Sequence, residues 1–330
     1  MQISDRIGRR MKLHDLHVLM GVVQAGSMGK AASLLNTTQS AISRSITELE
    51  HAVGVRLLDR SRQGVEPTEY GRALLDGGAA VFDDLRQAVK KIEFLADPTV
   101  GHVTVGGNEA TSAALLPAVF GRLRRRHPGL SMHVVPILSV AQQFQELRDR
   151  MADLIVGRLP SSIDSDIDSE VLFHDRLFVV AGSKSKWVGR RKIAFPELAN
   201  EPWLLPPLET VAGSLVADAF RLHGMEFPPQ GAATGAIHLS FALLASGPFL
   251  LTVPGSLLRL GTHLPSLKAL PVDFPGPAWP VGIMTLKNRM RSPVTKLFIE
   301  CAREVVKPLA ARQAPNGRTK IIPVQNAAKK

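Results

Sequence analysis

One short stretch of the chain concentrates polar side chains on a single side of a predicted helix. Between residues 39 and 53, apolar residues recur at steps of four, three and four, the spacing of one buried helical stripe: Ile42, Ile46, Leu49 and Val53. The polar residues fall on another face: Gln39, Ser40, Ser43, Arg44 and Thr47. Amide, hydroxyl and guanidinium groups form hydrogen bonds with base edges in the major groove of DNA. This helix therefore has the side chains to read DNA, although an ordinary amphipathic helix with a solvated face has the same periodicity.

The residues before this helix favour the DNA-reading interpretation. Residues 13–25 and 28–35 have helical spacing, and residues 36–38 are polar, as in a turn. Gly26 is suited to end the first of these helices and Ser27 to cap the second. Three helices with a short turn before the third form the helix-turn-helix pattern, whose last helix enters the major groove.

The residues after the helix predict a wing and then a long helix. Residues 55–58 have strand character, and residues 60–65 form a basic turn and return that includes Arg60 and Arg62. A long helix is expected from a cap at Thr68 to about residue 96. Its apolar residues alternate at steps of three and four, as in a coiled coil, with one weak position at Gly78: Leu75, Gly78, Phe82, Leu85, Val89, Ile92 and Ala96. So narrow a stripe predicts pairing with a second copy of the chain.

From residue 98 onward, short β-type runs alternate with helical stretches, which predicts parallel sheets built from βαβ units. We expect strands at residues 102–105, 130–135, 154–156, 177–181, 203–205, 249–253 and 281–286, and helices at 112–126, 140–150, 213–223, 237–245 and 293–311. Without a P-loop or a glycine-rich dinucleotide motif, this pattern suits a two-lobed ligand-binding domain. Residues 313–330 contain no acidic residue, and we expect a basic flexible tail there.

The composition narrows the possible partners. A net charge of +11 and an isoelectric point near 10.1 favour an acidic partner, with nucleic acid ahead of a membrane surface. The N-terminal residues lack the apolar segment of a secretory signal, and no run is long enough to span a membrane. Cys301 is the only cysteine, so we expect neither a disulfide nor a cysteine-rich zinc site. These features predict a cytoplasmic protein with no membrane partner, no metal and no cofactor.

The same residues carry a family resemblance. Over nearly its whole length the chain resembles a LysR-type transcriptional regulator, and its most specific part runs from Ser27 to Gly71. That part comprises Ser27, residues 30–35 (KAASLL), residues 39–46 (QSAISRSI), Leu49-Glu50, residues 54–58 (GVRLL), Arg60, Pro67-Thr68 and Gly71. The chain departs from the family's habit at Met28-Gly29, where an aromatic residue and a threonine are frequent, at Ser40, where proline is common, and at Pro67, where leucine is usual.

This resemblance implies a winged helix-turn-helix domain at residues 1–67, a dimerising linker helix at 68–97, and an α/β two-lobed effector domain resembling periplasmic solute-binding proteins at 98–312. Lobe I is expected at about 98–176 and 278–312, and lobe II at about 177–277. The implied function is a ligand-responsive regulator that binds double-stranded promoter DNA as a homodimer or homotetramer. The expected DNA-binding residues are Ser27, Lys30, Thr38, Gln39, Ser40, Ser43, Arg44, Thr47, Arg60 and Arg62.

The effector site is expected where strands end and helices begin, because helix N-termini offer free N–H groups. That rule selects Ala110, Thr111, Ser112, Ser139, Arg158, Ile237 and His238. In the family, a hydroxyl before the first helix of this domain commonly meets a ligand carboxylate. Ala110 stands near that position here, so Thr111 or Ser112 must take its place. Arg158 is suited either to a bidentate bond with a carboxylate or to a salt bridge with a neighbouring acid. We expect the effector to be a small acidic or sugar-like metabolite.

Other functions fit the sequence less well. It has no nucleophile–base motif, no metal-ligand spacing and no phosphate loop, so we do not expect an enzyme. The alternatives to a regulator are a solute-binding protein, which needs no helix-turn-helix, and an architectural DNA-binding protein, which needs no domain at 98–312. Four arginines of the first predicted helix of that domain are expected to form a solvated helix end: Arg122, Arg124, Arg125 and Arg126.

Overall fold

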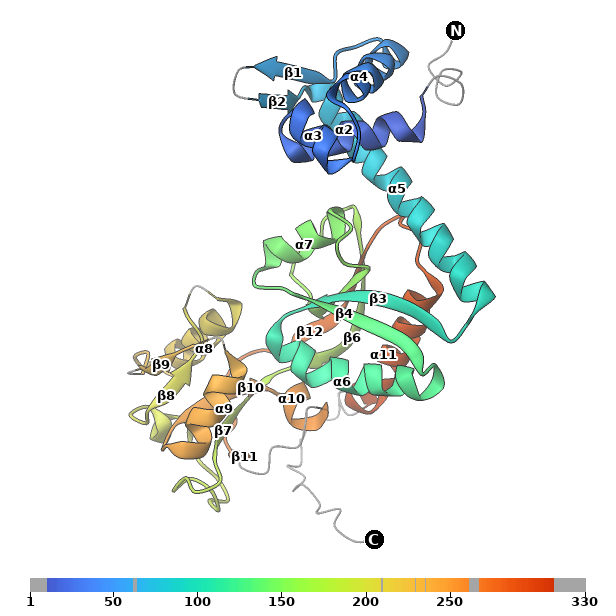
Figure 1. Ribbon diagram of the computed structural model, residues 1–330. Helices are drawn as coiled ribbons and strands as arrows, with labels where there is room; N and C mark the ends of the chain where they lie inside the picture. Colours follow the sequence, from blue (N-terminus) through green and yellow to red (C-terminus); the bar gives the residue numbers. More distant parts are fainter. Residues whose placement is uncertain are drawn as a thin grey trace. The chain divides into compact units, whose positions relative to one another are not determined.

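The computed structural model describes residues 11–61, 64–208, 210–228, 230–234, 236–260 and 267–311, and its elements are labelled in Figure 1. The chain divides into two compact units, Met1–Val89 and Lys90–Lys330. This division falls inside helix α5 (Glu69–Ala96), whereas the sequence prediction places boundaries at the two ends of that helix. Across the described ranges, no helix is both long and apolar enough to cross a bilayer. Arg62 and the tail predicted at 313–330 lie outside the described residues.

The first unit begins with the three predicted helices, α2 (Leu13–Ala25), α3 (Met28–Leu34) and α4 (Gln39–Val53). Gly26 ends α2 with a φ of +69°, a left-handed conformation that glycine adopts without a Cβ clash. Ser27 and Thr38 then cap α3 and α4. The apolar stripe of α4 is enclosed by this arrangement, and the fully buried side chains of the unit are Leu19, Val22, Ala31, Ile42, Ile46 and Leu49.

The wing is a two-stranded antiparallel hairpin of β1 (Leu58–Ser61) and β2 (Gly64–Pro67). The strand predicted at residues 55–58 was placed three residues too early. Leu57 and Leu58 are consecutive and both buried, so the apolar run that suggested a strand is where the chain enters the core. The backbone N–H of Val65 donates to the carbonyl of Gly26 over 3.0 Å, which attaches the wing to the turn between α2 and α3.

Helix α5 begins after Thr68, whose Oγ1 accepts the backbone N–H of Gly71 over 3.0 Å, as predicted for a cap. Two glycines allow the helix to pack closely on its own unit. A Cβ on Gly71 would lie 2.1 Å from the carbonyl oxygen of Leu57, and a Cβ on Gly78 would lie 2.9 Å from Leu16 Cδ1. The glycine that weakens the heptad pattern is therefore the place where α2 contacts α5.

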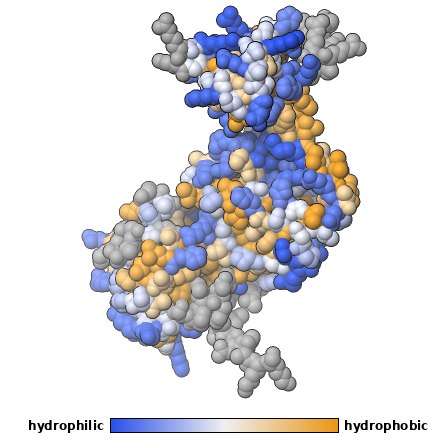
Figure 2. Space-filling view, in the orientation of Figure 1, coloured by the Kyte–Doolittle hydropathy of each residue, from blue (hydrophilic) through white to orange (hydrophobic). Residues whose placement is uncertain are grey.

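The predicted seam of α5 is divided into two halves. Leu75 and Phe82 pack against the core of the first unit, together with Gly78. Further along the helix, the exposed fractions of Leu85, Val89 and Ile92 are 44%, 52% and 65%. Figure 2 shows apolar surface along this part of the helix. Only the second half of the seam is thus available to a second copy.

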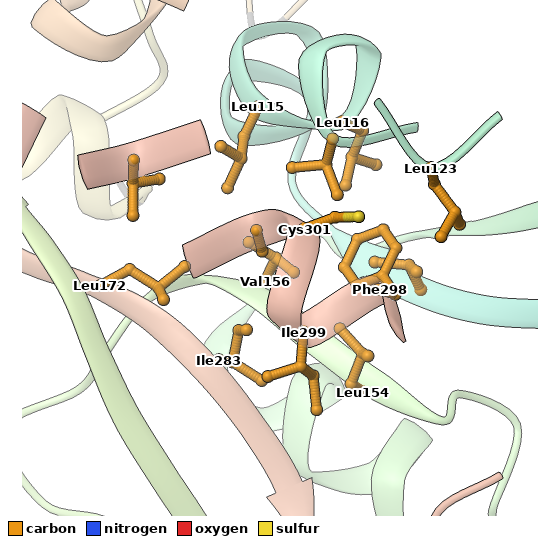
Figure 3. Close-up of a cluster of buried hydrophobic side chains, with 14 of the residues drawn as sticks. Leu115, Leu116, Leu123, Leu154, Val156, Leu172, Ile283, Phe298, Ile299 and Cys301 are labelled. Carbon is orange, nitrogen blue, oxygen red and sulfur yellow. The ribbon is translucent and has the colours of Figure 1, made fainter. Parts of the chain in front are cut away.

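Two sheets form the second unit. The first has the order β4-β3-β5-β12-β6 and is built from β3 (Val100–Gly107), β4 (Gly129–Pro136), β5 (Leu154–Arg158), β6 (Ile167–Asp175) and β12 (Trp279–Leu286), with helices α6 (Glu109–Arg126), α7 (Val140–Arg148) and α11 (Pro293–Ala311). Its core lies between the sheet, α6 and α11, where Leu115, Phe298 and Cys301 meet (Figure 3).

The second sheet has the order β11-β7-β10-β8-β9. It is built from β7 (Leu177–Gly182), β8 (Trp203–Leu205), β9 (Gln230–Ala233), β10 (Leu250–Pro254) and β11 (Leu267–Ala269), with the short helix η1 (Phe195–Leu198) and helices α8 (Val211–Leu222), α9 (Ile237–Ser246) and α10 (Gly255–Leu260). The chain passes from the first sheet to the second between β6 and β7, and returns between β11 and β12. The unit therefore has two lobes.

The prediction of purely parallel sheets was wrong. β3 pairs in parallel with β4 and β5, but β12 is antiparallel to both β5 and β6. In lobe II, β7 is antiparallel to β10 and β11. Strands β6, β9 and β11 were missed in the sequence. The two-lobed topology requires this mixture, because the strand that returns from lobe II enters the first sheet from the opposite end.

Candidate functional site

The reading helix α4 is fixed at its start and along its back. Thr38 Oγ1 accepts the backbone N–H of Ala41 over 3.2 Å and lies 3.0 Å from Ser40 Oγ. On the back of the helix, the buried Ser45 donates its hydroxyl to Asp15 Oδ1 of α2 over 2.6 Å. The sequence prediction missed this pair, since neither residue belongs to an apolar stripe or to the polar face. A bond between two buried polar groups orients α4 on α2 more specifically than apolar contact alone.

The polar face of α4 is open to solvent. Gln39, Ser40 and Thr47 are exposed and Ser43 is half-buried. Thr47 already donates its hydroxyl to the carbonyl of Ser43 over 2.9 Å. The side chain of Arg44 is 82% exposed, and its Nε donates to Glu48 Oε1 over 3.0 Å. The arginine that we expected to face bases therefore has a carboxylate beside it, and the sequence prediction did not include Glu48.

The remaining DNA-binding predictions lie on three neighbouring elements. Ser27 Oγ accepts the backbone N–H of Lys30 over 3.2 Å, so its oxygen serves as a helix cap. Lys30 is exposed on α3, and Arg60 is exposed on β1. Glu50 Oε1 accepts the backbone N–H groups of Leu57 and Leu58 over 2.8 and 3.3 Å, which positions the start of the wing. This carboxylate supports the wing, and the sequence alone indicated no such role.

The first group of effector-site predictions lies at the N-terminus of α6. Asn108 is the cap, and its Oδ1 accepts the backbone N–H of Thr111 over 2.8 Å. Ala110 and Thr111 are half-buried in the first turn. Among the described residues, Ser112 Oγ has no hydrogen-bond partner although the atom is buried. It lies 2.8 Å from the position of a Cβ on Gly107, and the carbonyl oxygen of Val156 lies 3.1 Å from that same position. This places Ser112 beside the end of β5.

Arg158 ends β5, and its environment distinguishes the two interpretations of the sequence. Within the described chain, its Nη1 is buried and has no hydrogen-bond partner, so the salt bridge to a neighbouring acid is not formed. The guanidinium carbon lies 5.5 Å from the ring centroid of Trp279 on β12, a cation–π distance. Burial lowers the pKa of the Arg158 guanidinium from its ordinary value. The residue is half-buried, and leaving its buried Nη1 without an anion is unfavourable, so an anionic ligand would reduce that penalty.

The other predicted effector residues, Ser139, Ile237 and His238, lie beside polar groups of the protein itself. Ser139 caps α7, and its Oγ accepts the backbone N–H of Gln142 over 3.1 Å. Helix α9 has no side-chain cap of its own, and the N–H of Ile237 donates instead to Glu109 Oε1 of α6 over 3.1 Å. His238 is 91% exposed, with its Nδ1 3.5 Å from the same oxygen. The structure thus brings Ile237 and His238 to α6 through Glu109, which the sequence prediction had not selected.

Trp279 is a further residue that the sequence prediction missed. Besides contacting Arg158, it lines a small hollow whose other walls are apolar: Leu177, Leu215, Phe274, Pro275, Gly276 and Pro277. The local sequence offered no signal beyond the presence of a tryptophan at the start of a strand.

Three of the four arginines at the end of α6 have partners within the protein, which corrects the prediction of a solvated helix end for them; Arg125 is exposed, as predicted. Arg122 Nε and Arg126 Nη2 both donate to Glu304 Oε2 of α11, over 2.5 and 3.0 Å. Arg124 donates to the carbonyl of Leu130 over 3.2 Å. This end of α6 is part of the packing of lobe I.

The chain carries a winged helix-turn-helix and a two-lobed domain, which together are the architecture of a ligand-responsive transcription regulator. Residues 13–72 match the family model of the bacterial regulatory helix-turn-helix protein, lysR family, and residues 96–307 match that of the LysR substrate binding domain. The chain belongs to the LysR family. Its members are transcription regulators and not enzymes, which confirms that part of the prediction.

Individual relatives agree with this assignment. The chain is 25% identical over 296 residues to the transcriptional regulator GbpR of Azospirillum brasilense, covering 89% of this chain and 86% of GbpR. It is 25% identical over 315 residues to PcaQ of Agrobacterium fabrum, covering 95% and 99% of the two chains. A solved full-length OxyR variant from Pseudomonas aeruginosa has the same fold, with a TM-score of 0.63, 20% identity and coverage of 92% and 99%.

Proposed function

We propose that this regulator reads promoter DNA with α4 and responds to a small carboxylate bound between its lobes. The observation that carries the effector class is the pair of buried polar atoms without a partner, Ser112 Oγ and Arg158 Nη1. Leaving a buried polar group unpaired costs about 1–3 kcal/mol, and more for a charge. Both atoms belong to residues that the sequence also selected, by their position at a strand or helix end and by their ability to bond a carboxylate.

A carboxylate suits these two groups better than a neutral sugar. A guanidinium keeps its charge and presents two parallel N–H groups that match the two oxygens of a carboxylate. The hydroxyl of Ser112 can donate a further hydrogen bond to such an oxygen. A sugar hydroxyl could bond either group, but it would leave the positive charge of Arg158 uncompensated. The ring of Trp279 beside the guanidinium offers apolar contact to the rest of the ligand.

On the DNA side, the exposed groups of α4 support base reading by Gln39, Ser43 and Arg44. Lys30 and Arg60 are exposed on the neighbouring elements and suit contact with phosphates. The exposed half of the α5 seam supports assembly as a dimer, or as a tetramer of two dimers. The half-sites of a dimer would be separated by about 34 Å or a multiple of it, since each reading helix must enter a major groove on one side of the duplex.

A thermal-shift screen tests the effector class. Full-length protein is heated with a panel of small carboxylates and, separately, with neutral sugars of similar size. A ligand that binds only the folded state raises the melting temperature of the effector unit, and the rise grows with the logarithm of the ligand concentration above its Kd. We expect the shift among the carboxylates. If only the neutral sugars raise the melting temperature, the proposal is wrong. If no compound raises it at millimolar concentration, the architectural role without effector control is favoured.

Footprinting on the DNA upstream of the protein's own gene tests the DNA-binding part. We expect protected segments spaced by about one helical turn or a multiple of it. Log affinity should also fall linearly with log salt, because neutralised phosphates release counterions. A continuous, unspaced footprint at every sequence tested would contradict sequence-specific reading.

A further inference from the structure

Glu48 lies on the reading side of α4, where neither the packing of the helix nor the proposed DNA contacts requires a carboxylate. It follows Arg44 by one helical turn, which places it about 40° round the helix and about 6 Å along its axis. Its side chain is 46% exposed, so it faces solvent and not the core. A carboxylate on a surface that approaches a polyanion opposes binding through its charge. A residue that opposes binding in this way needs a compensating role.

Helix stability does not supply that role. Exposed ion pairs of this kind contribute roughly 0–1 kcal/mol. The order is also the less favourable one, because an acid four residues after a base interacts less well with the helix dipole than an acid before a base. Arg44 and Glu48 are therefore poorly arranged for stabilising α4. Their proximity is better explained by what the two groups present to DNA.

The ion pair limits how Arg44 can meet a base. A guanidinium has five N–H groups, and Glu48 accepts the one on Nε over 3.0 Å. The four N–H groups of the two terminal nitrogens remain, and they form an end-on fork. Such a fork matches the O6 and N7 acceptors of guanine. Because Glu48 holds the side chain of Arg44 by its Nε, less conformational freedom is lost when the fork binds.

The carboxylate itself can also read a base. It is acceptor-only, and in the major groove cytosine presents only the donor N4–H₂. Guanine presents only the N7 and O6 acceptors there and thymine the O4 acceptor, and these repel a carboxylate. Adenine presents an N6–H₂ donor beside its N7 acceptor, so cytosine is the base that offers a donor without a neighbouring acceptor. Since Glu48 is about 6 Å further along the helix, it would face a different base pair near the guanine.

We propose that Glu48 is a specificity-determining residue of the reading helix, which holds the Arg44 guanidinium towards a guanine and accepts a hydrogen bond from a nearby cytosine amino group. This inference rests on the proposed reading role of Arg44. The Arg44–Glu48 ion pair would then give α4 two linked preferences, for a guanine and for a nearby cytosine. A neutral residue at position 48 should weaken these preferences, while sequence-independent binding to DNA persists.

The test is selection of bound sequences from random double-stranded DNA by the full-length protein, compared between wild type and three variants. Glu48→Gln keeps an acceptor for Arg44 Nε but adds a donor, so it should lose the cytosine preference and retain the guanine preference. Glu48→Ala should lose both, with base discrimination reduced about tenfold at each position. Asp76→Asn is the matched control, since it removes one exposed carboxylate of the same unit away from α4.

Affinity for mixed-sequence DNA separates specificity from structure. Both Glu48 variants should bind it as tightly as wild type or more tightly, because a negative charge near the phosphates is gone. If Glu48→Ala selects the same bases with the same preference, the inference is wrong. It is equally wrong if Glu48→Ala weakens specific and mixed-sequence binding together and melts at a lower temperature, since that result indicates a structural role. Wild type that enriches no sequence would instead contradict the reading role of α4.

Discussion

The proposed reading surface and the proposed effector site differ in whether their polar groups already have partners within the protein. On α4, three exposed polar side chains already have a partner within the protein: Thr38 caps the helix, Thr47 donates to the carbonyl of Ser43, and Arg44 donates to Glu48. At the proposed effector site, Ser112 Oγ and Arg158 Nη1 are buried and have no hydrogen-bond partner within the described part of the chain. DNA binds at a solvated surface, where water serves the polar groups until the partner arrives. A small ligand enters a desolvated site, and the groups that will bind it must be left unpaired beforehand.

The largest effect is expected on the stability of the first unit, without a change in the stability of the second. Leu49→Ala removes a fully buried side chain from the core of the first unit, and such changes cost about 2–5 kcal/mol. We expect calorimetry to show an early transition for the first unit, with the transition of the second unit unchanged. A single transition that moves as a whole would mean that the shared helix α5 couples the units into one cooperative structure.

The next effect concerns ligand binding. Arg158→Ala removes the unpaired cation, and the charge-assisted hydrogen bonds that it would make with a carboxylate contribute about 1.5–3 kcal/mol. The ligand-induced rise in melting temperature should therefore disappear, while gel-shift assays show unchanged DNA affinity. Arg190→Ala is the control, since it removes a more exposed arginine of the same unit. A normal ligand response in Arg158→Ala would exclude this residue from the site.

A smaller effect is expected on the reading surface. Arg44→Ala removes one bidentate base contact, for which about 1–3 kcal/mol of discrimination is typical. Because the side chain is 82% exposed, the variant should stay folded and oligomeric. A gel-shift assay against a selected sequence should show the loss, and Arg72→Ala, on the exposed surface of α5, should not. Unchanged specific affinity would contradict the reading role of Arg44.

The smallest effect depends on pH and lies outside both sites. Hydrogen bonds from Arg126 and Arg122 lower the pKa of Glu304 below its ordinary value of 4.5. A carboxyl with a depressed pKa contributes stability above its unfolded-state pKa and loses it as the pH falls through the lower, folded-state pKa. The advantage of wild type over Glu304→Gln in thermal unfolding should therefore be present at pH 7 and shrink below pH 4.5. An advantage that is constant across this window would show that packing, not charge, makes the contribution.

The first unit could be predicted from the sequence because its signals are local. Caps at Ser27 and Thr38, the glycine at Gly26 and the stripe of α4 all act within a few residues. The wing was misplaced because both Leu57 and Leu58 are buried, which breaks the alternation expected of a strand.

Pairing between distant segments could not be predicted in the same way. Strand β6 has exposed acidic residues that obscure its β character, and one of them, Glu170, is held by Arg303 of α11 through two bonds of 2.7 Å. The candidate effector residues were located by a general rule about strand ends. The sequence does not show which of these residues lack a partner. It also does not show that Glu109 bonds to Ile237 or that Trp279 lies beside Arg158, because these contacts join segments more than 100 residues apart.

The close approach of α2 and α5 at Gly78 affects how far apart the reading helices of two paired copies would lie. Because a Cβ at Gly78 would lie 2.9 Å from Leu16 Cδ1, a shift of α5 that brought a larger side chain to this place would clash with α2. The exposed side chains of Leu85, Val89 and Ile92 follow on the same helix. If two copies of the chain pair along these exposed side chains of α5, the position of α5 on each first unit would set the separation of the two reading helices along DNA.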